Sequence, residues 1–263
     1  MKGSLLLAWQ VKDKHCLVIG SGDVALSRIN HLVIAQAKIT VISGDGHIHK
    51  EILDLAKTGE ITLHNRNYKD EDLKMYEKLE PQLDFKNLNT TAYSAISQLV
   101  DETFACVLCC IDDYELSAKI YYQCKLLRLP VNIADKPPLC DFYFGSMINQ
   151  ESLQIMISTN GKSPRLSKLI KDNIAKQFVG VDLNNAIENL GLVRARLREL
   201  ILVDDDLVTI DTRMNWIKAL TDFFTVKEWS LLHLTQNQAD KIIKCFPDFP
   251  PKQYDEFQTY ISS

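Results

Sequence analysis

Short apolar runs alternate with segments of helical periodicity along the first half of the chain. Five runs have the length and apolar character of buried strands, at residues 16–19, 38–42, 61–64, 104–111 and 130–134. Helical spacing of apolar residues occurs between them, at about residues 26–35, 48–57 and 116–127. Strands that alternate with helices predict a parallel sheet with helices on both faces. Residues 68–102 are polar and weakly patterned, and they predict a partly helical insertion before the fourth strand.

The pattern changes after Asp135. Residues 142–148 and 153–157 predict two strands around a turn at Asn149–Gln150, and beyond residue 181 the apolar spacing is helical. The expected fold class is α/β, with a small α+β segment and a helical region following the Rossmann-like sheet. Three domains are expected, a Rossmann domain in residues 1–135, an α+β segment in residues 136–180 and a helical C-terminal domain in residues 181–263.

Composition narrows the class of protein. Hydrophobic residues make up 46% of the chain and charged residues 24%, which is typical of a globular protein. The net charge of −4 gives no reason to expect a nucleic-acid partner. Seven cysteines, an odd number with three in the run 104–111, indicate a reducing compartment. The apolar stretches are too short for a signal peptide or a membrane helix, so we expect a soluble, cytoplasmic protein without a membrane partner.

A glycine motif marks the first strand-to-helix turn. The segment Gly20-Ser-Gly22-Asp23-Val24-Ala25 has the form G-x-G-x-x-A, with a predicted strand before it and a predicted helix after it. The first glycine allows a tight turn, the second lets the backbone approach a pyrophosphate, and the alanine permits close helix packing. We therefore expect a dinucleotide site here. The alternative is a glycine turn in a doubly wound domain without a cofactor.

Ser43, Gly44 and Asp45 follow the second strand, where the adenosine of a dinucleotide is expected. An acid in this place accepts hydrogen bonds from the ribose hydroxyls and repels a 2′-phosphate, which favours NAD over NADP. No arginine stands near this strand end in the sequence. The alternative for Asp45 is a solvated turn residue, because Ser-Gly-Asp-Gly also suits a turn.

Asp135 is the residue expected to be catalytic. It follows the fifth strand in Asn132-Ile-Ala-Asp-Lys-Pro137, at the carboxyl edge where open α/β sheets bind their ligands. A carboxylate in such a cleft can act as a general base. The alternative is a helix cap or a turn residue that pairs with Lys136.

A second loop offers groups for an anionic substrate. Asn160, Ser163, Arg165 and Lys168 lie in or just after Ser158-Thr-Asn-Gly-Lys-Ser-Pro-Arg165, with Ser163 expected to cap a helix that begins with Pro164. Hydroxyls, backbone N–H groups and cations suit carboxylates. The alternative is a well-capped helix with solvated charges.

We expect no metal site. His47 and His49 are interpreted as solvated, and Cys106-x-x-Cys109 lies in a buried strand with no second pair of matching spacing.

Four segments together resemble the siroheme synthase family, and its yeast-type bifunctional members in particular. They are Val11–Lys14, Val18–Ala25, Asn132–Gly145 and Ile157–Arg165. The resemblance implies that NAD oxidises precorrin-2 to sirohydrochlorin and that ferrous iron, a substrate, is then inserted to give siroheme. It further implies that Asp135 serves both reactions and that a homodimer forms through residues 136–180.

Some features depart from that pattern. Ser21 replaces a common glycine, Ser43-Gly-Asp45 replaces a more usual Ser-Pro-Asp, and residues 68–102 have no clear counterpart. Two alternatives stay open, a precorrin-2 dehydrogenase without chelatase activity and a non-catalytic NAD-sensing dimer. A sensor would bind NAD normally and tolerate the loss of Asp135.

Overall fold

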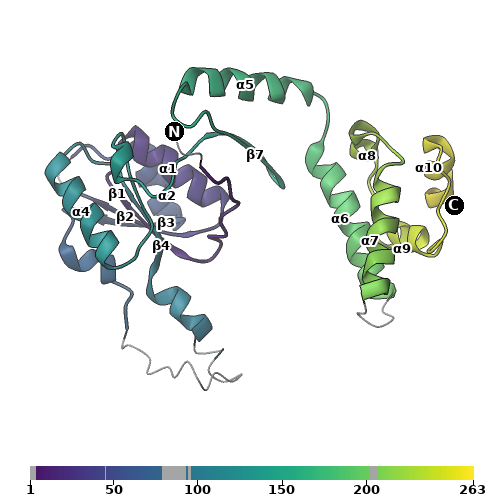
Figure 1. The fold of residues 1–263 in the computed structure, drawn as a ribbon, viewed down its shortest axis with the longest axis horizontal. Helices are drawn as coiled ribbons and strands as arrows, with labels where there is room; N and C mark the ends of the chain where they lie inside the picture. The colour runs from purple at the N-terminus through teal and green to yellow at the C-terminus, as the bar shows by residue number, and fades with distance from the viewer. Residues whose placement is uncertain (1–3, 45, 79–92, 94–95, 202–206) are drawn as a thin grey trace. The chain divides into compact units, whose positions relative to one another are not determined.

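The computed structural model describes residues 4–263 apart from residues 45, 79–92, 94–95 and 202–206. The chain forms two compact units, residues 4–144 and residues 145–263 (Figure 1).

A five-stranded sheet is the centre of the first unit. Its strands are β1 (His15–Ile19), β2 (Lys38–Ser43), β3 (Ile61–Asn65), β4 (Phe104–Cys109) and β5 (Val131–Ile133). The order is β3-β2-β1-β4-β5, and every neighbouring pair is parallel, which confirms the predicted sheet. Because the strand order reverses between β1 and β4, the turn after β1 lies at the switch point where such sheets bind ligands.

Helices cover both faces of this sheet. The elements between the strands are α1 (Asp23–Ile34), α2 (Lys50–Thr58), η1 (Asp70–Lys74), η2 (Leu99–Glu102) and α4 (Tyr114–Leu126), and η3 (Pro137–Leu139) follows β5. Successive β1 residues point to opposite faces, so Cys16 and Val18 pack with α1 and α2, whereas Leu17 and Ile19 pack with α4 and η1. Burial on both faces explains why the strands are continuous apolar runs.

The second unit begins with an antiparallel hairpin of β6 (Ser146–Gln150) and β7 (Leu153–Ile157). Gln150 pairs with Leu153, so the turn lies at residues 151–152 and the expected turn at Asn149–Gln150 is wrong by two residues. The first strand also begins later than predicted. Phe142 and Phe144 instead pack against the core of the first unit, where Phe142 contacts Trp9 edge to face.

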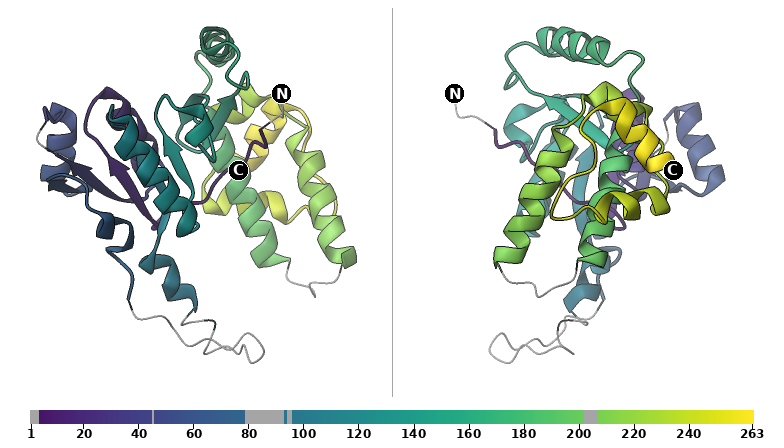
Figure 2. Two further views of the ribbon diagram at one scale, coloured as in Figure 1. Left: turned by 60° about the vertical axis from the view of Figure 1, so that its left-hand side comes forward. Right: turned by 90° about the vertical axis from the view of Figure 1, so that its right-hand side faces the viewer.

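Helices make up the rest of the second unit. They are α5 (Pro164–Gln177), α6 (Leu183–Leu200), α7 (Leu207–Thr221), α8 (Val226–Leu231), α9 (Gln236–Ile243) and α10 (Tyr254–Ser262). The ribbon of these helices is drawn in two further views in Figure 2. Helices α6 to α10 contribute residues to one buried cluster that includes Phe224, Trp229 and Phe257. The side chain of Asn189 ties α6 to the chain after α8, since its amide donates to the carbonyl oxygens of Trp229 and Leu232 and its oxygen accepts from Leu234 N.

Within the described part of the chain, none of the helices combines the length and apolar character that crossing a bilayer requires.

Candidate functional site

The turn after β1 requires glycine at its first position. Gly20 has a φ of +114°, and a Cβ there would lie 2.4 Å from the carbonyl oxygen of Cys110. Its N–H donates to Ile42 O at 2.8 Å, which continues the ladder from β1 towards β2. The backbone of the turn is therefore packed directly between the ends of the neighbouring strands.

Gly22 faces open space at the start of α1. It is the N-cap of the helix, and a Cβ built on it meets nothing within 4 Å. Asp23 and Val24 are exposed in the first turn, whereas Ala25 is fully buried against the sheet. A helix N-terminus with an open approach and no side chain at its cap suits an anion, because the first N–H groups point outward without intrahelical partners. These residues therefore fit the pyrophosphate of a dinucleotide.

The end of β2 is fixed to the glycine turn. Ser43 and Ser21 are both buried, and their hydroxyl oxygens lie 2.6 Å apart. The next residue, Gly44, lies so close to Asn67 that a Cβ would fall 1.7 Å from Asn67 Oδ1. Asp45 lies outside the described residues, so its expected contact with the ribose stays a prediction.

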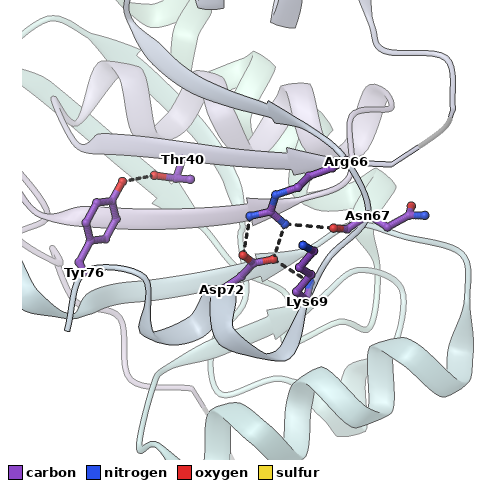
Figure 3. A network of polar contacts seen from close by, with 6 residues as sticks. All are labelled: Thr40, Arg66, Asn67, Lys69, Asp72 and Tyr76. Carbon is purple, nitrogen blue, oxygen red and sulfur yellow. Dashed lines mark hydrogen bonds and ion pairs between the residues drawn. The ribbon is translucent and has the colours of Figure 1, made fainter.

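Strand pairing brings an arginine to this edge, contrary to the expectation that none stands nearby. Ser43 pairs with Asn65 across β2 and β3, so Arg66 follows β3 beside Gly44. Figure 3 shows its guanidinium paired with Asp72. The sequence could not reveal this neighbour, because Arg66 lies 22 positions after Gly44 in the chain and only the sheet register joins them.

His49 has a structural role that the sequence did not predict. It is the N-cap of α2, where its Nδ1 accepts from Glu51 N at 3.2 Å. The backbone N–H of His49 donates to Ser21 O at 3.0 Å, and the ring Nε2 lies 3.7 Å from the carboxylate of Asp23. The histidine therefore connects α2 to the glycine turn.

Asp135 lies at the carboxyl edge of β5 in an unusual backbone conformation. Its φ of +57° is in the left-handed region, which non-glycine residues adopt at some cost. The preceding Ala134 N–H donates to Cys109 O at 2.8 Å, and Cys110 N–H donates to Ile19 O at 2.7 Å. These two bonds extend the sheet edge across β1, β4 and β5, so Asp135 and the glycine turn share one edge.

Lys136 does not form an ion pair with Asp135. The alternative in which Asp135 is a turn residue paired with Lys136 is therefore wrong. The lysine ammonium donates to Ile111 O at 3.3 Å and to Ser117 Oγ at 3.2 Å. The lysine therefore attaches the loop to the chain after β4, and its ammonium does not neutralise the carboxylate of Asp135.

Arg28 on α1 is a residue of this edge that the sequence did not single out. Its guanidinium carbon lies 4.1 Å from the centre of the Phe144 ring, and its buried Nε has no hydrogen-bond partner among the described residues. Burial lowers the pKa of Arg28, although the negative charge of Asp135 acts in the opposite direction. Burial also raises the pKa of Cys110 to about 12, so this thiol is protonated at neutral pH and is a poor nucleophile.

The expected substrate-binding loop belongs to the second unit. Asn160 and Gly161 have φ values of +51° and +74°, and Ser163 occupies the N-cap position of α5. The predicted N-cap position is confirmed, and the side chain of Ser163 makes no capping hydrogen bond there. Arg165 and Lys168 are exposed in the first turns of α5, and neither forms an ion pair with another described residue. Their binding role stays a prediction.

The described residues contain no group of three or more His, Cys, Asp or Glu side chains that could hold a metal ion. Cys106 and Cys109 are 3% and 0% exposed in β4, as expected for residues of the core.

A parallel sheet with a glycine turn open at a helix N-terminus defines the dinucleotide-binding class of Rossmann proteins. Three family models agree with this class and extend it. Residues 7–146 match the model described as "Putative NAD(P)-binding", residues 150–177 match "Sirohaem biosynthesis protein central" and residues 181–248 match "Sirohaem biosynthesis protein C-terminal". The chain belongs to the siroheme biosynthesis protein family, and it is an enzyme of siroheme biosynthesis.

Two fungal relatives, each named a siroheme biosynthesis protein, match most of the chain. The relative from Schizosaccharomyces pombe is 33% identical over 257 residues, which span 98% of this chain and 84% of that protein. The relative from Saccharomyces cerevisiae is 36% identical over 244 residues, 86% of this chain and 85% of that one. The solved structure "SirC, precorrin-2 dehydrogenase" has a TM-score of 0.58 at 17% identity and covers 92% of this chain and 100% of its own, which shows the shared fold.

Proposed function

We propose that the chain oxidises precorrin-2 to sirohydrochlorin with NAD and then inserts ferrous iron to give siroheme. The observation that carries the proposal is the shared sheet edge of the glycine turn and Asp135. The relative SirC is named a precorrin-2 dehydrogenase, and the fungal relatives are named siroheme biosynthesis proteins. These names and the position of the Asp135 carboxylate, at the sheet edge where this fold binds its ligands, both support the proposal.

Each part of the edge has a role in the oxidation. The N-terminus of α1, with Gly20 and Gly22, binds the pyrophosphate of NAD, and Ser43 and Gly44 lie beside the adenosine. NAD, when bound, supplies the hydride acceptor of the reaction. Removing two hydrogens from the substrate as a hydride and a proton leaves one proton to be accepted. Asp135 Oδ is the atom that we assign to accept it.

Iron insertion uses the same carboxylate as a base. Two pyrrole N–H protons leave sirohydrochlorin when Fe²⁺ enters, and Asp135 accepts them one at a time, releasing the first to solvent before it takes the second. Iron is a passing substrate here, so the reaction needs a base and access for the ion rather than a resident metal centre. The exposed cations Arg165 and Lys168, with Asn160 and Ser163, are proposed to bind the carboxylate groups of the tetrapyrrole.

We also propose that the chain acts as a homodimer, through residues 136–180. Leu166, Leu169 and Ile170 are 50%, 44% and 37% exposed, and their spacing puts them on one face of α5. Ser167 lies on another face and is hydrogen-bonded to Ser146 of the hairpin. Analytical ultracentrifugation tests the proposal by the mass of the protein in solution. Wild type should sediment as a dimer, and the double variant Leu166→Glu with Ile170→Glu should sediment as a monomer. An unchanged mass in the double variant would contradict the proposal.

An anaerobic optical assay tests the two reactions in sequence. Purified protein is mixed with precorrin-2, first without and then with NAD, and ferrous iron is added after the oxidation. We expect sirohydrochlorin only when NAD is present, followed by siroheme formation faster than in a protein-free control. Oxidation without faster iron insertion would leave a dehydrogenase alone. The absence of both reactions would contradict the proposal and would favour a protein that senses NAD.

A further inference from the structure

Arg66 lies next to the end of β2, where the adenosine of the dinucleotide is expected, and its guanidinium is already paired with a carboxylate. Asn65 pairs with Ser43, and Asn67 touches Gly44, so Arg66 lies between two residues that contact the end of β2. In Rossmann proteins that use NADP, an arginine near this strand end accommodates the 2′-phosphate of the adenosine ribose. Arg66 therefore stands where an NADP-binding arginine is expected.

Asp72 occupies the guanidinium in a two-pronged pair. Arg66 Nη2 donates to Asp72 Oδ1 at 2.6 Å and Arg66 Nη1 donates to Asp72 Oδ2 at 2.8 Å (Figure 3). Arg66 Nη1 also donates to the carbonyl oxygen of Asn67 at 3.1 Å. Such planar pairs are among the strongest that arginine makes, and they fix the direction of the guanidinium.

The carboxylate is the fixed partner of the pair and the guanidinium is the accessible one. The side chain of Asp72 is 5% exposed, and its Oδ2 accepts from Lys69 N at 2.7 Å, whereas the side chain of Arg66 is 34% exposed. Two residues past η1, the Tyr76 hydroxyl lies 2.8 Å from Thr40 Oγ1 of β2 and so attaches this segment to the sheet. Asp72 therefore cannot follow Arg66 if the arginine turns to a ligand.

The ionisation of both groups agrees with this pairing. Burial acts to raise the pKa of Asp72, but the hydrogen bonds from Arg66 and from the Lys69 backbone outweigh it and the pKa is lowered. The hydrogen bond to Asp72 in turn raises the pKa of Arg66. Both groups are charged at neutral pH.

We propose, on the basis of the dinucleotide site of the proposed function, that Asp72 makes the enzyme select NAD over NADP by holding Arg66 away from the adenosine ribose. A 2′-phosphate beside Gly44 would have to draw Arg66 off Asp72, which would leave a buried carboxylate without its counter-charge. NAD carries a free 2′-hydroxyl and makes no such demand. Asp72 is thus a specificity-determining residue that does not itself touch the cofactor.

Binding of NADH and NADPH, followed by their fluorescence, tests the proposal in the full chain. The quantity of interest is the ratio of the NADPH Kd to the NADH Kd. In Asp72→Asn, which keeps the size of the side chain, we expect this ratio to fall about tenfold or more, as one charge-assisted hydrogen bond to the phosphate would give. In Arg66→Gln with Asp72→Asn, the ratio should return to the wild-type value because no guanidinium is freed.

Asp70→Asn is the matched control for charge. It removes one negative charge from the same turn, but Asp70 is half exposed and paired with Lys119 at 2.8 Å, so Arg66 is not released. The ratio should stay at the wild-type value. An equal fall in Asp70→Asn and Asp72→Asn, or an unchanged ratio in folded Asp72→Asn, would overturn the proposal.

A single variant covers the case in which Asp72→Asn does not fold. In Arg66→Gln alone, the ratio should stay within about twofold of wild type, because the paired guanidinium contributes nothing to NADPH binding. A clear rise in the ratio would mean that Arg66 already binds the phosphate, and it would overturn the proposal. Wild-type protein that binds neither NADH nor NADPH would instead overturn the dinucleotide site itself.

Discussion

Ser21 Oγ lies 2.6 Å from Ser43 Oγ, and this buried contact joins the glycine turn to the last residue of β2. The carbonyl oxygen of Ser21 also accepts from His49 N at the start of α2. The residue at the variable position of the glycine motif therefore fixes the turn from two sides. The serine that departs from the usual family pattern has a structural reason in this chain.

The contact should be visible as coupling between the two serines. Ser21→Ala and Ser43→Ala should each lower the free energy of unfolding by about 1 kcal/mol, since each leaves a buried hydroxyl without its partner. The double variant should cost clearly less than the sum, because its two single changes remove the same bond. Urea unfolding measures all three, with the exposed Ser27→Ala as the control. Additive losses would contradict the contact.

The two glycines of the turn should respond differently to alanine. Gly20→Ala should lower the free energy of unfolding by about 2 kcal/mol or more, because its φ is +114° and its Cβ would collide with Cys110 O. Gly22→Ala should lower it by no more than about 1 kcal/mol, because its Cβ meets nothing and only the poorer N-cap preference of alanine counts. Thermal or urea unfolding of both variants tests the comparison. Equal losses would show that the space above Gly22 is not open.

Stability should fall in mild acid because of His15. Its ring is stacked on Tyr76 with centroids 3.8 Å apart, and burial, helped by the charge of Lys38, lowers its pKa below the ordinary value of 6.5. The unfolded chain therefore binds a proton more readily than the native one, so stability is full above about pH 6.5 and is lost as the pH falls towards the native pKa. Unfolding free energies between about pH 5 and 8 measure this slope. His15→Phe should flatten it, and an unchanged slope would contradict the assignment.

Asp135 should be necessary for both reactions although its backbone conformation lowers the free energy of unfolding. Asp135→Asn should lower the rates of precorrin-2 oxidation and iron insertion by about 100-fold or more, because the base is lost. Asp135→Gly should lower them likewise, yet raise the free energy of unfolding by up to about 1 kcal/mol, since glycine accepts a φ of +57° freely. Paired rate and unfolding measurements decide the matter. Full activity of either variant would remove Asp135 from the mechanism.

Local patterns were enough to predict the sheet and the glycine turn. Each strand is a short apolar run because both faces of the sheet are covered, and the turn after β1 combines glycines with a strand and a helix that flank it. The same holds for Asp135, which is placed at the carboxyl edge by its position after β5. Patterns of this kind depend on residues close together in the chain.

Features that depend on register or long-range contacts could not be predicted in this way. Arg66 reaches Gly44 only because Asn65 pairs with Ser43, and Arg28 reaches the same edge as Asp135 only because α1 packs beside β4. The left-handed backbone of Asp135 has no signal in its sequence. The hairpin turn was misplaced because Asn149 is a common turn residue, whereas the register puts Glu151, at φ +48°, in the turn.

The most direct test compares wild type with Gly22→Asp in NAD-dependent oxidation of precorrin-2. Aspartate is a favoured N-cap and its Cβ has open space, so the variant should fold as wild type does by circular dichroism. Its carboxylate would lie at the N-terminus of α1, where the pyrophosphate must bind. We expect NADH binding and sirohydrochlorin formation to be lost together. Oxidation at the wild-type rate by a folded Gly22→Asp protein would contradict the central claim that this turn binds the cofactor.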